Sequence, residues 1–365
     1  MRILIDIGHP AHVHLFKNFT IEMQKQGHIV LFTCREKEFE IELLKANGFK
    51  YVSFGKKYKS IAGKIFGLLV FDLKMLKTAI KFKPDIFLSV GSMYAAQVAF
   101  MLRKPHFTFE DTGNLEQIRL YLPFTKMVFT PDVLKRDLGE KQLRYPSYHE
   151  LAYLSPNYFS PDNSIYKFLG IESKDSYVII RFVSWNATHD VGQNGINDKD
   201  KNDIISFLAT KYKVFISSES ELPVELKKYK IKIPPEHIHH ALYYADLVIS
   251  EGATMASEAG VLGTTAIYVN SIEACNNRDQ EKYELVYNFK SGQGVLDKVK
   301  EIVKENLGKE ELNNRKEIML SNKIDVTDFL LWFVKNYPES YLELKKNPKY
   351  QFNFKINNGL HSKKI

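Results

Sequence analysis

The sequence predicts an α/β protein with two Rossmann-type domains, each built on a parallel sheet. Short apolar runs alternate with segments of helical periodicity, which is typical of βαβ units. The alternation occurs twice, before and after the polar stretch SPNYFSPDNS (155–164), which contains two prolines. A chain of 365 residues is long enough to bury two separate cores. We therefore expect domains at 1–160 and 161–325, a last helix over 326–345 and a tail at 346–365.

The first domain is expected to contain strands made of short runs of β-branched, aromatic and aliphatic residues. These runs cover 2–8, 28–34, 84–91 and 105–111. Between them, apolar residues recur three or four positions apart, as they do on one face of a helix. The expected helices lie near 12–27, 36–47, 61–82 and 93–103.

The second domain repeats the pattern. Its expected strands cover 177–184, 212–218, 230–234, 245–250 and 265–269. Its expected helices lie near 199–211, 236–244 and 254–262. The acidic run around Asp198 and Asp200 spells a DxD motif, but its charged surroundings favour a solvated helix start over a metal site.

The composition narrows the class of function. The chain contains no run of 18 uncharged apolar residues, so we expect a cytoplasmic protein, or one at the inner face of the membrane. Cys34 and Cys275 lack CxxC partners and predict neither a disulfide framework nor a zinc site. The net charge of +8 suits an anionic ligand, an anionic membrane surface or nucleic acid. Nucleic acid is disfavoured because no basic and aromatic stacking platform is recognisable.

The loops that follow strands are where ligands bind in open α/β sheets. After ADLVIS, Gly252, Ala253, Thr254 and Met255 enter a helix whose first amides lack intrahelical partners. Such a turn is suited to an anionic diphosphate, and Glu258 is close enough to accept hydrogen bonds from a ribose. The alternative is a tight strand-to-helix connection with a solvated Glu258.

This stretch resembles the donor-nucleotide motif of the GT-B glycosyltransferases, especially the N-acetylglucosaminyltransferase that makes lipid II. The resemblance implies a GT-B-like fold with two Rossmann-type domains facing across a cleft. It also implies that residues 252–255 hold the diphosphate of a nucleotide sugar and that Glu258 binds the ribose. The non-hydrolysing UDP-N-acetylglucosamine 2-epimerases carry a related motif. Glu251 departs from the transferase pattern, which has a small polar residue there.

The loop GHPAHVHLF (8–16) follows the first strand. Gly8 permits a close turn, and His12 can donate, accept or transfer a proton near neutral pH. The spacing of its histidines is not that of a metal site, so no metal is expected. His12 matches the Gly-His-Val turn of the lipid II transferase, which implies a position in the cleft near the acceptor.

Glu110 and Asp111 end the fourth strand in FEDTGN (109–114) and are candidate general bases, although Asp111 also fits a helix N-cap. This segment resembles that of the 2-epimerases, in which the residue at Glu110 belongs to the catalytic acids. An acid that the epimerases place after the preceding strand is Ser92 here.

The loop FVSWNATHDVGQNG (182–195) lies under the donor diphosphate in GT-B enzymes. That resemblance implies Ser184 as a nucleotide-sugar residue, and the epimerases, which have a histidine in this loop, imply a catalytic role for His189. A surface loop with a capped turn is the alternative for His189. Arg181 can neutralise phosphate charge, with a buried ion pair as the alternative. Asp279 and Gln280 resemble the Asp-Arg-Gln-Gln stretch that holds donor-sugar hydroxyls in the lipid II transferase, with an exposed helix start as the alternative.

The leading hypothesis is metal-independent glycosyl transfer from a nucleotide-diphosphate sugar, with UDP as the expected nucleotide and no cofactor. The resemblance implies a cell-surface glycan precursor as the acceptor. Residues 56–83 are both basic and apolar and suit an anionic membrane, which would favour a lipid-linked acceptor. The alternative is a core helix with exposed lysines. His12, Glu110 or Asp111 would activate the acceptor hydroxyl. The alternative is a 2-epimerase that uses Glu110, Asp111 and His189. Over almost its whole length, the chain resembles a bacterial and archaeal protein family of unknown function, and the last helix resembles one that crosses back to the first domain in GT-B proteins.

Overall fold

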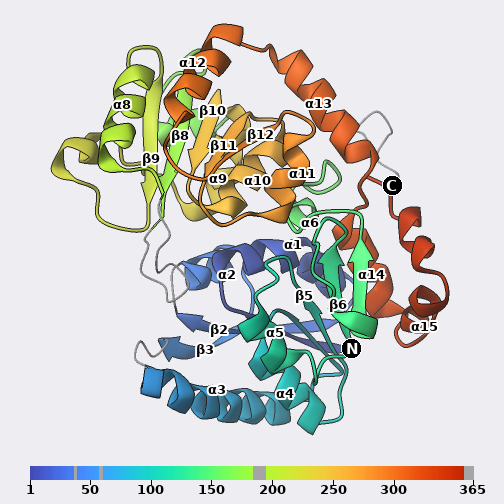
Figure 1. Cartoon of the computed structure of the whole chain (residues 1–365). Helices are drawn as coiled ribbons and strands as arrows, with labels where there is room; N and C mark the ends of the chain where they lie inside the picture. The colour runs from blue at the N-terminus through green and yellow to red at the C-terminus, as the bar shows by residue number, and fades with distance from the viewer. Residues whose placement is uncertain (37–38, 57–60, 184–194, 357–365) are drawn as a thin grey trace. The chain divides into compact units, whose positions relative to one another are not determined.

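A computed structural model describes residues 1–36, 39–56, 61–183 and 195–356. The chain divides into two compact units (Figure 1). Unit 1 contains residues 1–158 and 323–356, and unit 2 contains residues 159–322. The division falls within two residues of the expected boundary near 160. Residues 323–356 belong to unit 1, although they follow unit 2 in the sequence.

Unit 1 is built on a parallel sheet with the order β3-β2-β1-β4-β5-β6-β7. The strands are β1 (Arg2–Ile7), β2 (Ile29–Glu36), β3 (Tyr51–Lys56), β4 (Ile86–Val90), β5 (His106–Phe109), β6 (Met127–Pro131) and β7 (Gln142–Tyr145). The central strands are largely apolar because helices cover both of their faces. Helices α1 (Pro10–Lys25) and α2 (Glu40–Ala46) lie on one face, and α3 (Ile61–Phe82) and α4 (Met93–Met101) lie on the other (Figure 1). Two shorter helices are α5 (Leu115–Tyr121) and α6 (Leu151–Leu154).

The C-terminal segment of unit 1 is more extensive than the expected single helix. It forms α14 (Val326–Lys335), α15 (Glu339–Lys346) and a 3-10 turn over Pro348–Asn353. Phe333 of α14 packs edge-to-face against Phe107 and Phe129 of the sheet, at 4.9 and 5.0 Å between ring centroids. The expectation of a tail from residue 346 is wrong for residues 346–356, because Tyr350 stacks on Trp332 and Gln351 donates to the Arg144 carbonyl.

Unit 2 contains a five-stranded parallel sheet with the order β12-β11-β10-β8-β9. Its strands are β8 (Tyr177–Phe182), β9 (Lys213–Ser218), β10 (Leu247–Ser250), β11 (Ala266–Val269) and β12 (Val286–Phe289). Its helices are α7 (Ile165–Leu169), α8 (Asp198–Leu208), α9 (Ile238–Tyr244), α10 (Ala253–Leu262), α11 (Cys275–Glu281), α12 (Val295–Glu305) and α13 (Lys309–Ser321).

The strand expected at 230–234 is wrong. Only Lys230 forms an isolated bridge, to Ile216, and Pro234, which lacks an N–H, leads into a 3-10 turn at Pro235. Strands β3, β6, β7 and β12 were not expected, because their runs are short and mixed with polar residues. Within the described residues, no helix is both long and apolar enough to cross a membrane.

Candidate functional site

The turn between β10 and α10 in unit 2 presents a helix end with open hydrogen-bond donors. Gly252 is the N-cap of α10, with φ −94° and ψ 127°, and it supplies no capping side chain. Within the described part of the chain, the amides of Ala253, Thr254 and Met255 have no hydrogen-bond partner, and these three residues are half-buried. An anion at this end would receive several N–H donors and the favourable end of the helix dipole.

Glu258 lies further along α10 and is only 5% exposed. Its Oε1 is 3.0 Å from Nε2 of His239, which comes from α9. Charged side chains are rarely buried without a partner, and His239 is a partner of Glu258 here. The structure therefore pairs the predicted ribose ligand with a histidine of the neighbouring helix, a partner that the spacing along the sequence did not indicate.

Glu251 has a structural role that its position in the motif did not suggest. Its carboxylate is fully buried and accepts hydrogen bonds from the amides of Val183 and Ile196, each at 2.9 Å. These amides flank residues 184–194. Burial raises the pKa of Glu251, against the opposing effect of Lys201, whose ammonium is 3.8 Å away. Glu251 thus anchors both ends of the segment that follows β8.

Three other predicted residues of unit 2 are engaged within the protein. Arg181 donates to Ser217 and to Glu219, each at 2.8 Å. It therefore forms the ion pair within the protein that was the alternative to phosphate binding.

Asp279 is 6% exposed and lies 2.8 Å from the Lys282 ammonium. Gln280 is fully buried and donates to the Ser257 hydroxyl at 2.9 Å, so its predicted contact with sugar hydroxyls is wrong for this structure. Ser184 and His189 lie outside the described residues.

In unit 1, Gly8 and His12 form the turn between β1 and α1. His9 caps the helix by accepting from the Ala11 amide, and Nδ1 of His12 accepts from the Gly8 amide at 3.2 Å. Burial, followed by the nearby His9, lowers the pKa of His12 well below its usual value. Because a backbone N–H can only donate, neutral His12 carries its hydrogen on Nε2 and presents a donor there. That arrangement fits a hydrogen bond to a ligand oxygen better than it fits a general base.

Glu110 is 3% exposed and accepts hydrogen bonds from four donors. They are the amide and hydroxyl of Thr112, the amide of Gly113 and the hydroxyl of Tyr121, at 2.6 to 2.9 Å. A carboxylate bonded in this way holds the turn after β5. The predicted acid or base role of Glu110 is not supported by this geometry.

Asp111 forms an ion pair that the sequence did not indicate. Its Oδ2 is 3.1 Å from Nδ1 of His149, which lies between β7 and α6. Burial would raise the pKa of Asp111, but the charge and hydrogen bond of His149 lower it overall. His149 belongs to the stretch YPSYHE, which matches no catalytic motif, so no signal in the sequence identified it.

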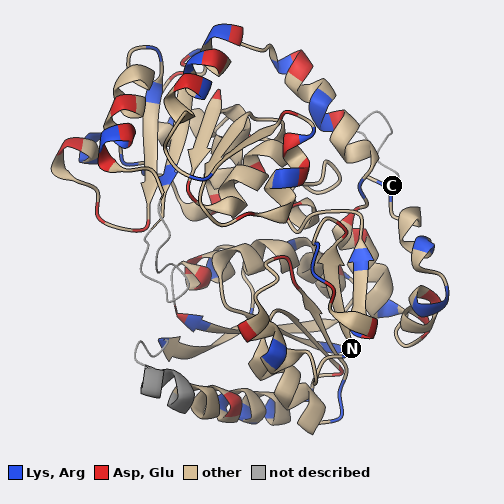
Figure 2. Ribbon diagram, viewed as in Figure 1, with Lys and Arg blue, Asp and Glu red and all other residues tan. Residues whose placement is uncertain are grey.

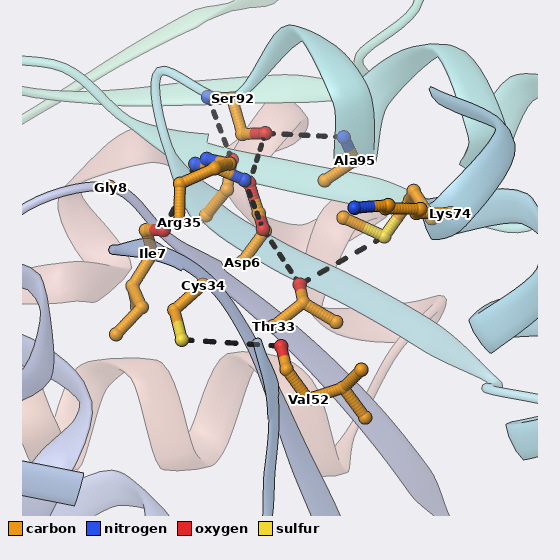
Figure 3. Close-up of polar contacts among 12 residues, drawn as sticks. Asp6, Ile7, Gly8, Thr33, Cys34, Arg35, Val52, Lys74, Ser92 and Ala95 are labelled. Carbon is orange, nitrogen blue, oxygen red and sulfur yellow. Dashed lines mark hydrogen bonds and ion pairs between the residues drawn. The ribbon is translucent and has the colours of Figure 1, made fainter. Parts of the chain in front are cut away.

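Ser92, at the position of an epimerase acid, belongs to a closed buried network (Figure 3). The carboxylate of Asp6 is fully buried and accepts from Ser92, from Thr33 and from the guanidinium of Arg35, the last two at 2.7 Å. Ser92 also caps α4 by accepting from the Ala95 amide. The network satisfies the Asp6 charge and leaves Ser92 in a structural role.

A metal centre is not formed by the side chains that the structure describes. No three His, Cys, Asp or Glu residues are grouped there so as to hold an ion. Metal independence remains a prediction.

Comparisons with solved structures show the fold. The UDP-GlcNAc 2-epimerase of Neisseria meningitidis, bound to UDP-GlcNAc, aligns with a TM-score of 0.62 and 13% identity, over 94% of this chain and 100% of that one. The MnaA–UDP structure of S. aureus aligns with a TM-score of 0.64 and 12% identity, over 94% and 97% of the two chains. A spinosyn rhamnosyltransferase complexed with spinosyn aglycone aligns with a TM-score of 0.58 and 12% identity, over 92% and 100%.

These similarities assign both parallel-sheet α/β units to the architecture shared by GT-B glycosyltransferases and the 2-epimerases. A search of curated proteins found no match to the sequence. The model of a family described as "Protein of unknown function (DUF354)" matches residues 1–339. Because that match spans most of the chain, the protein belongs to the DUF354 family.

Proposed function

We propose that the chain is a glycosyltransferase that binds a nucleotide-diphosphate sugar, with UDP as the nucleotide, at the start of α10. The observation that carries this proposal is the helix end at 253–255, where amide donors remain open beside the paired Glu258. The structural neighbours include proteins bound to UDP, UDP-GlcNAc and thymidine diphosphate.

The proposed reaction uses the helix end as an electrostatic support. The acceptor hydroxyl oxygen bonds to C1 of the sugar, the bond from C1 to the diphosphate oxygen breaks, and the electron pair leaves with the diphosphate. The amides of α10 stabilise the charge that develops on this leaving group, without a metal ion. Glu258, oriented by His239, binds the ribose hydroxyls in this proposal.

The epimerase alternative has less support in unit 1. Ser92 is committed to Asp6 and Ala95, and Glu110 is saturated by four donors. Incubation of UDP-GlcNAc in deuterated water without an acceptor distinguishes the two functions. Deuterium at C2 of the sugar would favour the epimerase, whereas a glycosyltransferase introduces none.

Replacing Ala253 with proline tests the amide site directly. Proline is tolerated at the first position of a helix, where it removes only one N–H. Gly252 already has the extended backbone that a residue before proline requires. A hydrogen bond to a charged group contributes about 1.5–3 kcal/mol, so we expect UDP to bind roughly 10- to 100-fold more weakly to Ala253→Pro.

The matched control is Lys309→Pro, at the first position of α13, which also follows an extended glycine. Both variants should keep the melting temperature of the wild type without ligand. Screening with UDP, GDP, CMP and TDP sugars identifies the nucleotide, since only a ligand of the folded state raises that temperature. Equal UDP affinity in both proline variants, or no response to any nucleotide, would contradict the proposal.

We also propose a lipid-linked acceptor used in cell-surface glycan synthesis at the inner face of the membrane, where unit 1 contacts anionic lipid. Leu69 and Leu73 of α3 are each 65% exposed, and Ile80 on the same helical face is 57% exposed. Lys74 and Lys77 are also exposed on this helix, which carries more basic than acidic residues in Figure 2. Exposed aliphatic residues beside lysines are typical of helices that lie on an anionic bilayer.

A further inference from the structure

The ion pair between Asp111 and His149 joins two loops at the carboxyl edge of the unit 1 sheet. Asp111 follows β5, and His149 follows β7. The side chain of Asp111 is 28% exposed, whereas that of His149 is 11% exposed. The acid is therefore the partner that a substrate can reach, and the histidine stands behind it.

The imidazole of His149 is held in a fixed orientation. Phe109 contacts it edge-to-face at 5.5 Å, and Tyr145 stacks on it at 6.4 Å with an angle of 15° between the rings. Nδ1 faces Asp111, while Nε2 is buried with no hydrogen-bond partner among the residues described. Because its other nitrogen is unpaired, the hydrogen bond to Asp111 is the polar contact that this structure gives the ring.

The charges around the pair favour an imidazolium beside a carboxylate. Burial would lower the pKa of His149, but Asp111, followed by Glu150 and Glu110, raises it overall. On the other side, the charge and hydrogen bond of His149 lower the pKa of Asp111 despite burial. The two shifts have opposite directions, and each favours the charged form of its own side chain.

We propose that His149 is a positioning residue that orients Asp111 as the base for the acceptor hydroxyl. Asp111 takes the hydroxyl proton while the oxygen bonds to C1 of the sugar and the diphosphate leaves with the electrons of the broken bond. His12 is less suited to this step because Nδ1 accepts from Gly8, and Glu110 is less suited because four donors occupy it. This inference rests on the proposed glycosyl transfer.

Two substitutions separate positioning from packing. His149→Phe keeps an aromatic ring but removes the hydrogen bond, and His149→Asn retains an N–H donor near the place of Nδ1. We expect His149→Phe to lower kcat at least tenfold, with an unchanged KM for the donor, and His149→Asn to recover part of that loss. The acid limb of the pH profile of kcat should move to higher pH in His149→Phe, because Asp111 loses the neighbour whose charge and hydrogen bond lower its pKa.

His106→Asn is the matched control. His106 is fully buried and bonded to Ser89 and Thr125, and burial lowers its pKa to about 3, so it is uncharged near neutrality. Its replacement should lower stability and leave the pH profile in place. An unchanged profile in His149→Phe, or the same shift in His106→Asn, would overturn the positioning role.

A second measurement does not depend on turnover. The ring signals of His149, assigned by their loss in His149→Phe, should titrate above pH 6.5 in the wild type and at lower pH in Asp111→Asn. Titration at or below 6.5, or no change in Asp111→Asn, would refute the ion pair. If no nucleotide sugar binds while this titration is observed, glycosyl transfer fails and the ion pair stands. If transfer occurs and His149→Phe matches the wild type, only the role of His149 fails.

Discussion

Replacing Asp6 with asparagine should destabilise unit 1 strongly. Asp6 is fully buried in β1, and the side chain of its partner Arg35 is only 5% exposed. Asparagine keeps the size of the side chain but leaves the Arg35 charge in the interior without a counter-charge. Removal of one member of a buried ion pair costs about 3–5 kcal/mol. That cost is a large fraction of the roughly 5–15 kcal/mol that stabilises a typical domain.

The loss can be measured for unit 1 alone by urea unfolding. The chain has two tryptophans, and Trp332 stacks on Tyr350 in unit 1 at 4.6 Å. A Trp185→Phe background leaves Trp332 as the single tryptophan reporter of this unit. In that background, Asp6→Asn should lower the free energy of unfolding by about 3–5 kcal/mol.

Two controls define the interpretation of this experiment. Lys25→Ala breaks an exposed pair with Glu22 on α1 and should cost less than about 1 kcal/mol. The double variant Asp6→Leu with Arg35→Met removes both charges and should be more stable than Asp6→Asn. A loss below about 1 kcal/mol in Asp6→Asn, or a double variant no more stable than the single one, would refute the argument from an unpaired buried charge.

Three further predictions concern packing, pH dependence and membrane binding. Gly260→Ala places a methyl group 2.6 Å from Oε1 of Gln280, so the free energy of unfolding of unit 2, measured by chemical denaturation, should fall by about 1–3 kcal/mol. The added methyl group of the control Gly308→Ala meets open space, so its loss of stability should be smaller. Burial raises the pKa of Asp325 to about 6, so the folded state binds the proton of this carboxyl more tightly than the unfolded state does. As the pH falls from 7 to 4, the free energy of unfolding of the wild type should therefore rise by up to about 3 kcal/mol relative to that of Asp325→Asn. A difference that does not change with pH would contradict this prediction. Lys77→Glu should reduce co-sedimentation with phosphatidylglycerol vesicles roughly tenfold or more, since each lysine near an anionic surface contributes about 1 kcal/mol.

The vesicle experiment has a control in unit 2 and an alternative outcome. Lys300→Glu reverses a charge on α12 and should leave sedimentation unchanged, because the proposed surface belongs to α3. Light scattering of the wild type distinguishes membrane contact from self-association. A dimer that Leu73→Glu converts to a monomer, with no vesicle binding, would show that the α3 face binds a second copy instead.

The alternation of apolar runs was sufficient to predict the fold class, because buried parallel strands and amphipathic helices leave different periods in the sequence. It failed for short strands such as β7, whose residues QLRY lack a strand-like run. It also failed at 230–234, where an alternating pattern precedes Pro234 and pairs with the sheet only at Lys230. Short segments depend on tertiary pairing, which local patterns do not encode.

The local sequence indicates the helix end of the candidate site but not the partners of its acidic residues. The helix end at 253–255 follows from the local sequence because capping and backbone donors are local properties. The roles of Glu110 and Asp111 depend on Tyr121 and His149, which come from other segments of the chain. Two adjacent acids look alike in a sequence, yet one holds a turn and the other forms an ion pair.

Glu251 fixes the two points of the unit 2 framework that flank residues 184–194. Its single carboxylate secures Val183 and Ile196 on either side, so the attachment points are set by β10 and not by the intervening residues. The entropic free-energy cost of loop closure rises by only about 0.6 kcal/mol when the loop length doubles. Substitutions between these two points would leave both attachments in place, because each uses a backbone amide of a residue outside 184–194.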